Sequence, residues 1–480
     1  MYSFIFGIIL LLLGYYVYGT YVEKQFGINE KRLTPAYALQ DGVDYVPMPT
    51  WKVYLIQLLN IAGLGPIFGA IQGALFGPAA FLWIVFGSIF AGAVHDYLSG
   101  MISIRHKGAS LSEIQGIYLG KKIQNIMRVF TIVLLVLVGV VFVTGPAKLL
   151  AAITPSSMTV TFWVVVVFAY YFLATMLPID VLIGNLYPLF GIALIVMAVG
   201  VGGAIILKGY NIPEISLVNL HPKKLPIFPM MFITIACGAI SGFHATQSPL
   251  MARCMKNEKY GRSVFYGAMI AEGVIALVWA AAGMAFYKGV PGLAAVLGKV
   301  GPSGVVLEIT KTLLGPIGGV LAMLGVVACP ITSGDTAFRG ARLMLADMIK
   351  FSQDKITKRL LLAIPLFALG IGLTFINFDI VWRYFAWANQ TLAMVTLWAA
   401  AVYLYKYKKN YWIAVVPATF MSYVSISYIL QAKEGFKLPA NTSNVIGLIV
   451  AGLLLAIFMI KTKEFVKTIK DIEEEVAITE

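Results

Sequence analysis

The sequence comprises 480 residues, of which 60% are hydrophobic and 12% charged, and it carries a net charge of +14. Because a soluble domain carries roughly 25% charged residues, this composition excludes a water-soluble fold and indicates a chain that lives in a lipid bilayer. It also argues against nucleic acid as a partner, since the Lys and Arg residues lie in short segments between apolar runs and no aqueous domain remains to bind it.

Apolar runs of about 20 residues, each able to cross a hydrocarbon core of roughly 30 Å as a helix, recur along the chain. Thirteen are predicted, at residues 2–22, 51–74, 79–104, 123–145, 159–177, 183–207, 228–250, 262–287, 314–338, 359–376, 380–405, 411–430 and 444–462. The first has no basic region before it and no small-residue cleavage site after it, so it is predicted to be a retained helix. The fold class is therefore predicted to be an all-α, multi-pass membrane protein.

The positive residues between these runs predict the orientation of the chain. Five clusters of Lys and Arg follow the third, seventh, ninth, eleventh and thirteenth runs, and Lys223–Lys224 is a minor exception. Because all five follow odd-numbered runs, they share one side, which is predicted to be the cytoplasm. The N-terminus is then outside, the C-terminus is inside, and the protein is predicted to lie in the cell (plasma) membrane.

The order of the runs predicts an internal repeat. Residues 1–50 form an extra helix and a cytoplasmic loop, five spans fill 51–207, five fill 228–405, and 411–480 adds two peripheral helices and a tail. Because five is odd, the second set begins on the side opposite to the first. This is the arrangement that a five-plus-five inverted repeat requires.

Helix-breaking residues occur in the first span of each half, at 60–66 and at 238–249, where Gly and Pro are combined. Unwound backbone survives in a bilayer only where it lines a cavity or is buried in protein. The freed amides are predicted to bind a carboxylate and the freed carbonyls a cation, although close packing at Gly and kinking at Pro are the structural alternative. The predicted substrate-binding residues are Asn60, Ala62, Gly63, Gly65, Ser241, Gly242, His244, Thr246, Gln247 and, from a polar cluster in 380–405, Asn389.

A third break is predicted at 329–335, beside Pro330. It offers the hydroxyl groups of Thr332 and Ser333. A resemblance to inverted-repeat transporters of the leucine-transporter type, whose corresponding span places hydroxyl groups against the first broken helix, implies a sodium site here, and a purely structural role is the alternative. The predicted break ends at Asp335, whose i, i+4 spacing to Arg339 fits a structural ion pair as well as a transport role.

Four further ionisable residues lie inside predicted spans, where a charge is costly and marks a functional site by default. His95 and Asp96 point about 100° apart on a helix and are predicted not to face the same spot. His244 is the best candidate for a proton-sensitive ligand, and Glu272 is a candidate proton carrier; each also has a structural alternative. The predicted coupling-ion residues are His95, Asp96, Glu272, Thr332, Ser333 and Asp335.

Neither a metal site nor an enzyme is predicted. Two His and a carboxylate are too common to indicate a metal, and the spacing of Cys237, Cys254 and Cys329 matches no zinc or disulfide framework. The sequence contains no HExxH or GxSxG motif. No cofactor is therefore expected.

Five motifs give the chain a resemblance to the carbon starvation protein A (CstA) family: 34–36 with 41–47, Ile61–Pro66, Ala91–Asp96, Ser241–His244 and 382–390 with its Ala-Asn-Gln triplet. The resemblance runs from about Arg32 to about Ala400. It implies import of small peptides or pyruvate, the latter by proton symport, on the leucine-transporter-like fold of the amino acid–polyamine–organocation superfamily. Many members carry Gln at the position of His95, and familiar members are longer.

The predicted function is a secondary active transporter that imports small carboxylate-bearing solutes, such as pyruvate or small peptides, by proton symport through alternating access. A sodium-coupled carrier for another organic solute is the alternative. An ion channel would need a filter-like motif that the sequence lacks. The partners are a small-molecule solute and the lipid bilayer, and the oligomeric state is left open.

Overall fold

The computed structural model describes the backbone of residues 1–42, 44–174, 179–353 and 355–479, and the side chains of these residues except 179–186 and 468–479. Residues 175–177 of the predicted run 159–177 and position 43 of the 41–47 motif lie outside it. The α-helices are α1 (Tyr2–Leu13), α2 (Gly19–Phe26), α3 (Pro35–Ala38), α4 (Thr50–Ile61), α5 (Ala70–Gly73), α6 (Ala79–Gly87), α7 (Ala93–Arg105), α8 (Leu111–Leu119), α9 (Lys121–Ile153), α10 (Val160–Ala174), α11 (Ile179–Leu207), α12 (Phe232–Ile235), α13 (Gly242–Ala252), α14 (Gly267–Phe286), α15 (Val290–Ala322), α16 (Cys329–Ile349), α17 (Ile356–Thr374), α18 (Phe378–Lys406), α19 (Trp412–Gln431) and α20 (Ala440–Thr479).

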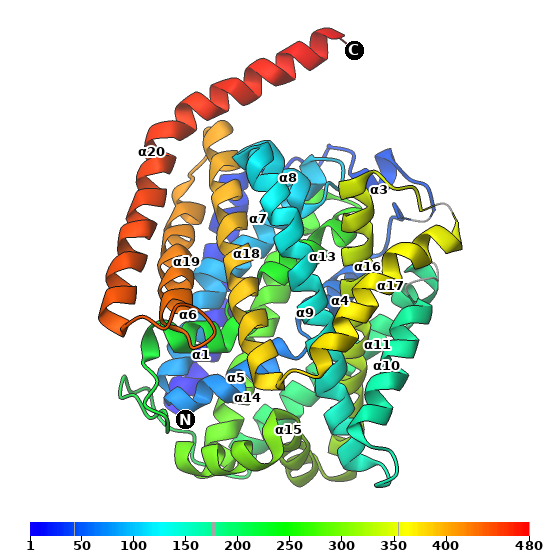
Figure 1. Ribbon diagram of the computed structural model, residues 1–480. Helices are drawn as coiled ribbons and strands as arrows, with labels where there is room; N and C mark the ends of the chain where they lie inside the picture. Colours follow the sequence, from blue (N-terminus) through cyan, green and yellow to red (C-terminus); the bar gives the residue numbers. More distant parts are fainter. Residues whose placement is uncertain (43, 175–178, 354, 480) are drawn as a thin grey trace.

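Each of the thirteen predicted runs falls on helix (Figure 1). Among the described residues, ten helices are long and apolar enough to cross a membrane, and the bent pair Thr50–Ile61 and Gly65–Phe76 adds an eleventh span. The other two runs coincide with α10, which has 15 residues, and with α18, which carries the polar stretch 389–391. The prediction of an all-α, multi-pass membrane protein is confirmed.

The five basic clusters lie on one face of the protein, here called the basic face. Residues of the first three clusters line two adjoining surface pockets, and residues of the last two line a third. Lys406 Nζ lies 5.9 Å from the ring centre of Tyr118 on α8, which joins the two sets. The helices α3 and α8 and the C-terminal tail are at this end of the molecule, and the N-terminus is at the other (Figure 1).

The first predicted helix break is present, and the second lies at 236–241, so that only the start of the predicted stretch 238–249 is unwound and the rest belongs to α13. Helix α4 ends at Ile61, and residues 62–64 leave helical geometry before a π-helical turn, η2 (Gly65–Gly69), resumes at an angle of 52°. In the second half, α12 ends at Ile235, a 3₁₀ turn follows, and Ser241 is extended before α13 begins at Gly242. Gly63, Gly65 and Pro66 explain the first break, whereas the second has only glycines beside it, Gly238 and Gly242, because Pro249 lies inside α13.

The third predicted break, at 329–335, is wrong. Helix α16 runs without interruption through these residues, and Pro330 lies in its first turn. A π-helical turn, η9 (Met323–Ala328), precedes it and takes up the missing backbone hydrogen bond of the proline without unwinding the helix. Residues 288–313, which separate the eighth and ninth predicted runs, are largely helical and belong to α15, which kinks at Gly301 and Gly315.

The two breaks pack directly against each other. A Cβ atom on Gly65 would lie 2.3 Å from Cys237 Cβ, and one on Gly69 would lie 2.6 Å from the Ile235 carbonyl oxygen. The glycines of the first break therefore allow its backbone to touch that of the second, which is the close-packing role of small residues between membrane helices.

Gly65→Ala is expected to destabilise the protein by about 1–3 kcal/mol, because a methyl group has no room against Cys237. The measurement is thermal unfolding of the purified protein in detergent. Gly372→Ala on α17 is the matched control, since a Cβ there meets nothing within 4 Å. Equal melting temperatures for the two variants would contradict the proposed contact.

Two sets of spans each pack among themselves. The bundle group consists of α4–α5, α6–α7, α12–α13 and α14, in which α13 contacts α7 and α4, and α14 contacts α4 and the η2 turn. The scaffold group consists of α9, α10, α16 and α17, in which α9 contacts each of the other three. The broken helices α4 and α13 thus both belong to the bundle group. They face α16 and α9 of the scaffold group.

A buried ion pair attaches the extra first helix to the bundle group. The Glu258 side chain is fully buried and accepts hydrogen bonds from Arg105 Nε at 2.7 Å and Nη2 at 2.8 Å. Its Oε2 also accepts the backbone amide of Asn29 at 2.8 Å, and Arg105 Nη2 donates to the Gly27 carbonyl at 2.9 Å. These four residues, the Glu258 node, tie the segment after α2 to the end of α7.

Candidate functional site

Four titratable side chains meet beside the second break. His244 lies in the first turn of α13, His95 and Asp96 lie on α7, and Glu272 lies on α14. All four side chains are fully buried. Asp96 Oδ1 lies 2.7 Å from His95 Nδ1, Asp96 Oδ2 lies 2.8 Å from His244 Nδ1, and Glu272 Oε2 lies 3.4 Å from His244 Nε2. We call this set the His–Asp–His–Glu cluster.

The expectation that His95 and Asp96 cannot face the same spot is wrong, because their side chains are hydrogen-bonded to each other. The angle of 100° describes the directions in which adjacent side chains leave the helix backbone. An imidazole and a carboxylate each extend several bonds from the backbone, so the two can bend toward a common point.

The hydrogen bonds of Asp96 constrain where protons lie in the cluster. A carboxylate only accepts hydrogen bonds, so when Asp96 is ionised both histidines present Nδ1–H to it. His244 Nε2 then faces Glu272 Oε2. One proton shared by these two atoms forms a hydrogen bond between them, and either the imidazole or the carboxyl group carries it. Within the described residues neither carboxyl oxygen of Glu272 has a conventional hydrogen-bond partner. The arrangement therefore suits a proton that moves between His244 and Glu272.

Asn389, on α18, holds the second break in place. Its Oδ1 accepts the Phe243 amide hydrogen at 2.7 Å, and its Nδ2 donates to Ser241 Oγ at 2.9 Å and to Cys237 Sγ at 3.1 Å. The amide that the break frees is thus capped by a side chain from another helix, as an N-cap residue does within one chain segment. Ser241 and Asn389 were both predicted to contact the solute, but here their side chains are hydrogen-bonded to each other.

Asn389→Leu is expected to loosen the second break, because a buried amide left without a partner costs about 1–3 kcal/mol. Backbone amides 241–246 should exchange hydrogen at least about tenfold faster, as measured by hydrogen-exchange mass spectrometry. Thr391→Val is the control: that hydroxyl group bonds Trp387 O and Ser425 Oγ and does not touch the break. Unchanged exchange in the Asn389 variant would show that the cap is dispensable.

The first break presents two backbone carbonyls to α16. The Leu59 carbonyl accepts from Ser333 Oγ at 3.2 Å, and the Ala62 carbonyl lies 3.5 Å from Cys329 Sγ. Thr332 Oγ1 donates to the Cys329 carbonyl at 2.7 Å. These carbonyl and hydroxyl oxygens are the hard ligands that a sodium ion would take. Asp335 follows Ser333 by two residues on α16, and its Oδ1 has no hydrogen-bond partner among the described residues.

Two buried amide side chains on α4 point to a polar interior. The side-chain nitrogen and oxygen of Asn60 and of Gln57 have no hydrogen-bond partner among the described residues. Helix α4 packs against α13 and α14, which carry His244 and Glu272. Sequence reasoning selected Asn60 and missed Gln57, although their i, i+3 spacing places them on one face of the helix. Gly63 packs on the Phe142 ring, and with Ala62 and Gly65 it offers only backbone groups.

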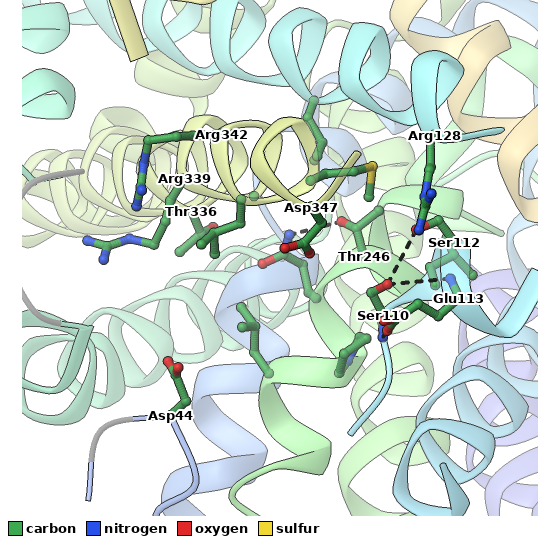
Figure 2. Close-up of a pocket in the computed structure, with 18 of the residues that line it drawn as sticks. Asp44, Ser110, Ser112, Glu113, Arg128, Thr246, Thr336, Arg339, Arg342 and Asp347 are labelled. Carbon is green, nitrogen blue, oxygen red and sulfur yellow. Dashed lines mark hydrogen bonds between the residues drawn. The ribbon is translucent and has the colours of Figure 1, made fainter. Parts of the chain in front are cut away.

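A cavity of about 500 Å³ at the basic face is lined in part by α13, the helix that follows the second break (Figure 2). Thr246 and Gln247 line its inner part, one turn or less beyond His244, and Gln247 Nε2 donates to Thr246 Oγ1 at 3.0 Å. The charged residues around it are Asp44, Glu113, Arg128, Arg253, Arg339, Arg342, Asp347 and Arg359. We call this cavity the vestibule. It lies between the bundle group and the scaffold group.

Sequence reasoning missed the vestibule because its arginines were assigned to membrane orientation and, for Arg339, to an ion pair with Asp335. The described residues contain no group of three or more His, Cys, Asp or Glu side chains arranged to hold a metal ion.

Relatives of the chain are membrane proteins and transporters. A membrane protein of Haemophilus influenzae is 46% identical over 337 residues, covering 59% of this chain and 91% of its own. The peptide transporter CstA of Campylobacter jejuni is 26% identical, covering 93% and 82%. The pyruvate/proton symporter BtsT of Escherichia coli is 28% identical, covering 56% and 46%.

Solved transporter structures share the fold. Mhp1, a nucleobase-cation-symport-1 family transporter, superposes with a TM-score of 0.54 over 92% of this chain and 96% of its own, at 14% identity. A manganese transporter of Eremococcus coleocola reaches 0.51 over 90% and 99%, also at 14% identity. These likenesses confirm the predicted leucine-transporter-like fold class.

The family model for carbon starvation protein CstA matches residues 1–206, 148–299 and 281–428. The protein is a transporter rather than an enzyme, and the chain belongs to the carbon starvation protein CstA family.

Proposed function

We propose that this transporter imports small carboxylate-bearing solutes, pyruvate or small peptides, by proton symport. The observation that carries the proposal is the His–Asp–His–Glu cluster: four titratable groups in contact, fully buried and beside a broken helix. The names of two relatives, a peptide transporter and a pyruvate/proton symporter, agree with it.

The charge of the cluster supports a proton as the coupling ion. Uncompensated charge at membrane depth is costly, so two carboxyl groups and two imidazoles favour the protonation states in which their charges cancel. Gain or loss of one proton shifts the cluster away from neutrality. A solute carboxylate bound at the neighbouring break would compensate a gained proton, which couples the two binding events.

The solute would lie between the broken helices, within reach of Asn60, His244 and Thr246, and leave through the vestibule. The basic face is then cytoplasmic and the N-terminus external. The inverted halves 51–207 and 228–405 supply one broken helix each, and 411–480 lies at the periphery. Turning of the bundle group against the scaffold group would open the site to each side in turn.

Uptake of labelled pyruvate and dialanine into proteoliposomes tests this proposal. Accumulation above the external concentration is expected with an inward proton gradient and is expected to vanish when a protonophore removes that gradient. If neither solute accumulates in response to the proton gradient, the proposal is wrong.

A sodium-coupled carrier is the second candidate, favoured by the oxygens of Leu59, Ala62, Cys329, Thr332 and Ser333 around the first break. The hydroxyl groups already donate to these carbonyls, so the break is satisfied without a cation. Uptake driven by an inward sodium gradient at equal pH on both sides would establish this alternative.

A further inference from the structure

The vestibule carries opposite charges that face each other without pairing. Arg128 on α9 and Asp347 near the end of α16 line the vestibule (Figure 2). Arg253, which directly follows α13, lines it from the bundle group. Arg128, Arg253 and Glu113 all lie within electrostatic range of Asp347. None of the ion pairs among the described residues involves Asp347, Arg128 or Arg253.

The nearby groups leave these charges available to a ligand. Arg253 donates from Nε to the Gly108 carbonyl at 3.1 Å and stacks on the Tyr45 ring at 5.2 Å, which orients its guanidinium group without neutralising it. Glu113 is engaged in capping α8, where it accepts the Ser110 amide hydrogen at 2.7 Å. Asp347 is exposed, with its carboxylate toward the cavity (Figure 2).

Separated charges of opposite sign are complementary to a molecule that carries both signs at its ends. A peptide has a terminal carboxylate, which suits a guanidinium group, and a terminal ammonium group, which suits a carboxylate. An anion as small as pyruvate has only the first. A volume of about 500 Å³ falls within the usual range for organic ligands and exceeds what pyruvate needs.

We propose that the vestibule is a second solute site, on the exit side of the central one, that binds zwitterions: the carboxylate lies at Arg128 and Arg253 and the ammonium group at Asp347. The inference deepens the proposed function and rests on it, because it assigns the peptide and pyruvate substrates different contacts in one pathway. Thr246 and Gln247 mark the end of the central site. A peptide that leaves the central site enters this second site before release.

Equilibrium binding of dialanine and of pyruvate to the purified full-length protein in detergent, measured by isothermal titration calorimetry, tests the inference. Asp347→Asn is expected to weaken dialanine binding about tenfold, the effect of losing one charge-assisted contact, and to leave pyruvate binding within about twofold. Asp347→Glu keeps the charge and is expected to retain dialanine binding. Asp379→Asn, which removes a carboxylate at the opposite end of the protein, is the control and should change neither.

The outcomes separate this inference from the proposed function. Equal weakening of both solutes by Asp347→Asn, no weakening of either, or no binding of dialanine to the wild-type protein would overturn the zwitterion site. The proton-driven uptake assay tests the proposed function independently, because it uses the wild-type protein and needs no difference between the two solutes.

Discussion

Uptake driven by a proton gradient is expected to fall about 100-fold or more in the Asp96→Asn variant. Asp96 accepts hydrogen bonds from His95 on one oxygen and from His244 on the other. A carboxamide keeps one acceptor and turns its NH₂ group toward the second ring, which must change tautomer to accept it, and the negative charge between the two rings is lost. Breaking a buried charge pair costs about 3–5 kcal/mol, and 1.36 kcal/mol corresponds to about a tenfold change in rate.

The measurement is accumulation of labelled solute in proteoliposomes with an imposed proton gradient, compared with exchange of internal for external solute at equal pH. The Asn side chain resembles a permanently protonated Asp96, so exchange should persist while accumulation is lost. His95→Gln is the matched control within the cluster. Its carboxamide can still donate to Asp96, and a loss below about tenfold is expected. Wild-type accumulation by the Asp96 variant would exclude the cluster as the coupling site.

Glu272→Gln is expected to abolish proton movement while the protein stays folded. Gln has nearly the same volume as Glu, and its NH₂ group can donate to His244 Nε2, so the buried geometry is kept. It cannot release a proton, however, and the proposed transfer between His244 and Glu272 is blocked. Solute-dependent proton uptake into proteoliposomes, followed with a trapped pH-sensitive dye, should fall at least about tenfold.

Glu308→Gln, on α15 outside the bundle group, is the corresponding control and should leave proton uptake unchanged. Its carboxylate accepts a hydrogen bond from the Tyr287 hydroxyl group at 2.8 Å. If the Glu272 variant carries protons at the wild-type rate, then Glu272 is a structural residue and the proton is held by the histidines and Asp96 alone.

The two helix breaks were predictable because their cause is local. Gly and Pro weaken a helix wherever they stand, and their recurrence at 60–66 and 238–249 marked the right spans, although the second break lies at 236–241 and Pro249 is inside α13. The error at 329–335 has a local cause as well. A π-helical turn before Pro330 absorbs the missing hydrogen bond, and a one-residue expansion of this kind has no clear signature in a single sequence.

The members of the site were predictable one by one, but their arrangement was not. An ionisable residue in an apolar span is conspicuous, so His95, Asp96, His244 and Glu272 were all selected from the sequence. Their contacts depend on how α7, α13 and α14 pack, which residue spacing does not determine. Asn389 was selected because it belongs to a polar cluster in an apolar span, and only the packing of α18 against the break reveals it as a cap.

The Glu258 node couples the first helix mechanically to the bundle group, although this helix lies outside both repeated halves. Any rotation of α7 must carry α1 and α2 with it, because Arg105 and the segment at 27–29 share one buried carboxylate. A spin label at the exposed Tyr16 and another at the exposed Leu361 on α17 would therefore report the swing between inward and outward states as a change in distance. A label on the first helix would thus follow the movement of the bundle group through the transport cycle without altering the site itself.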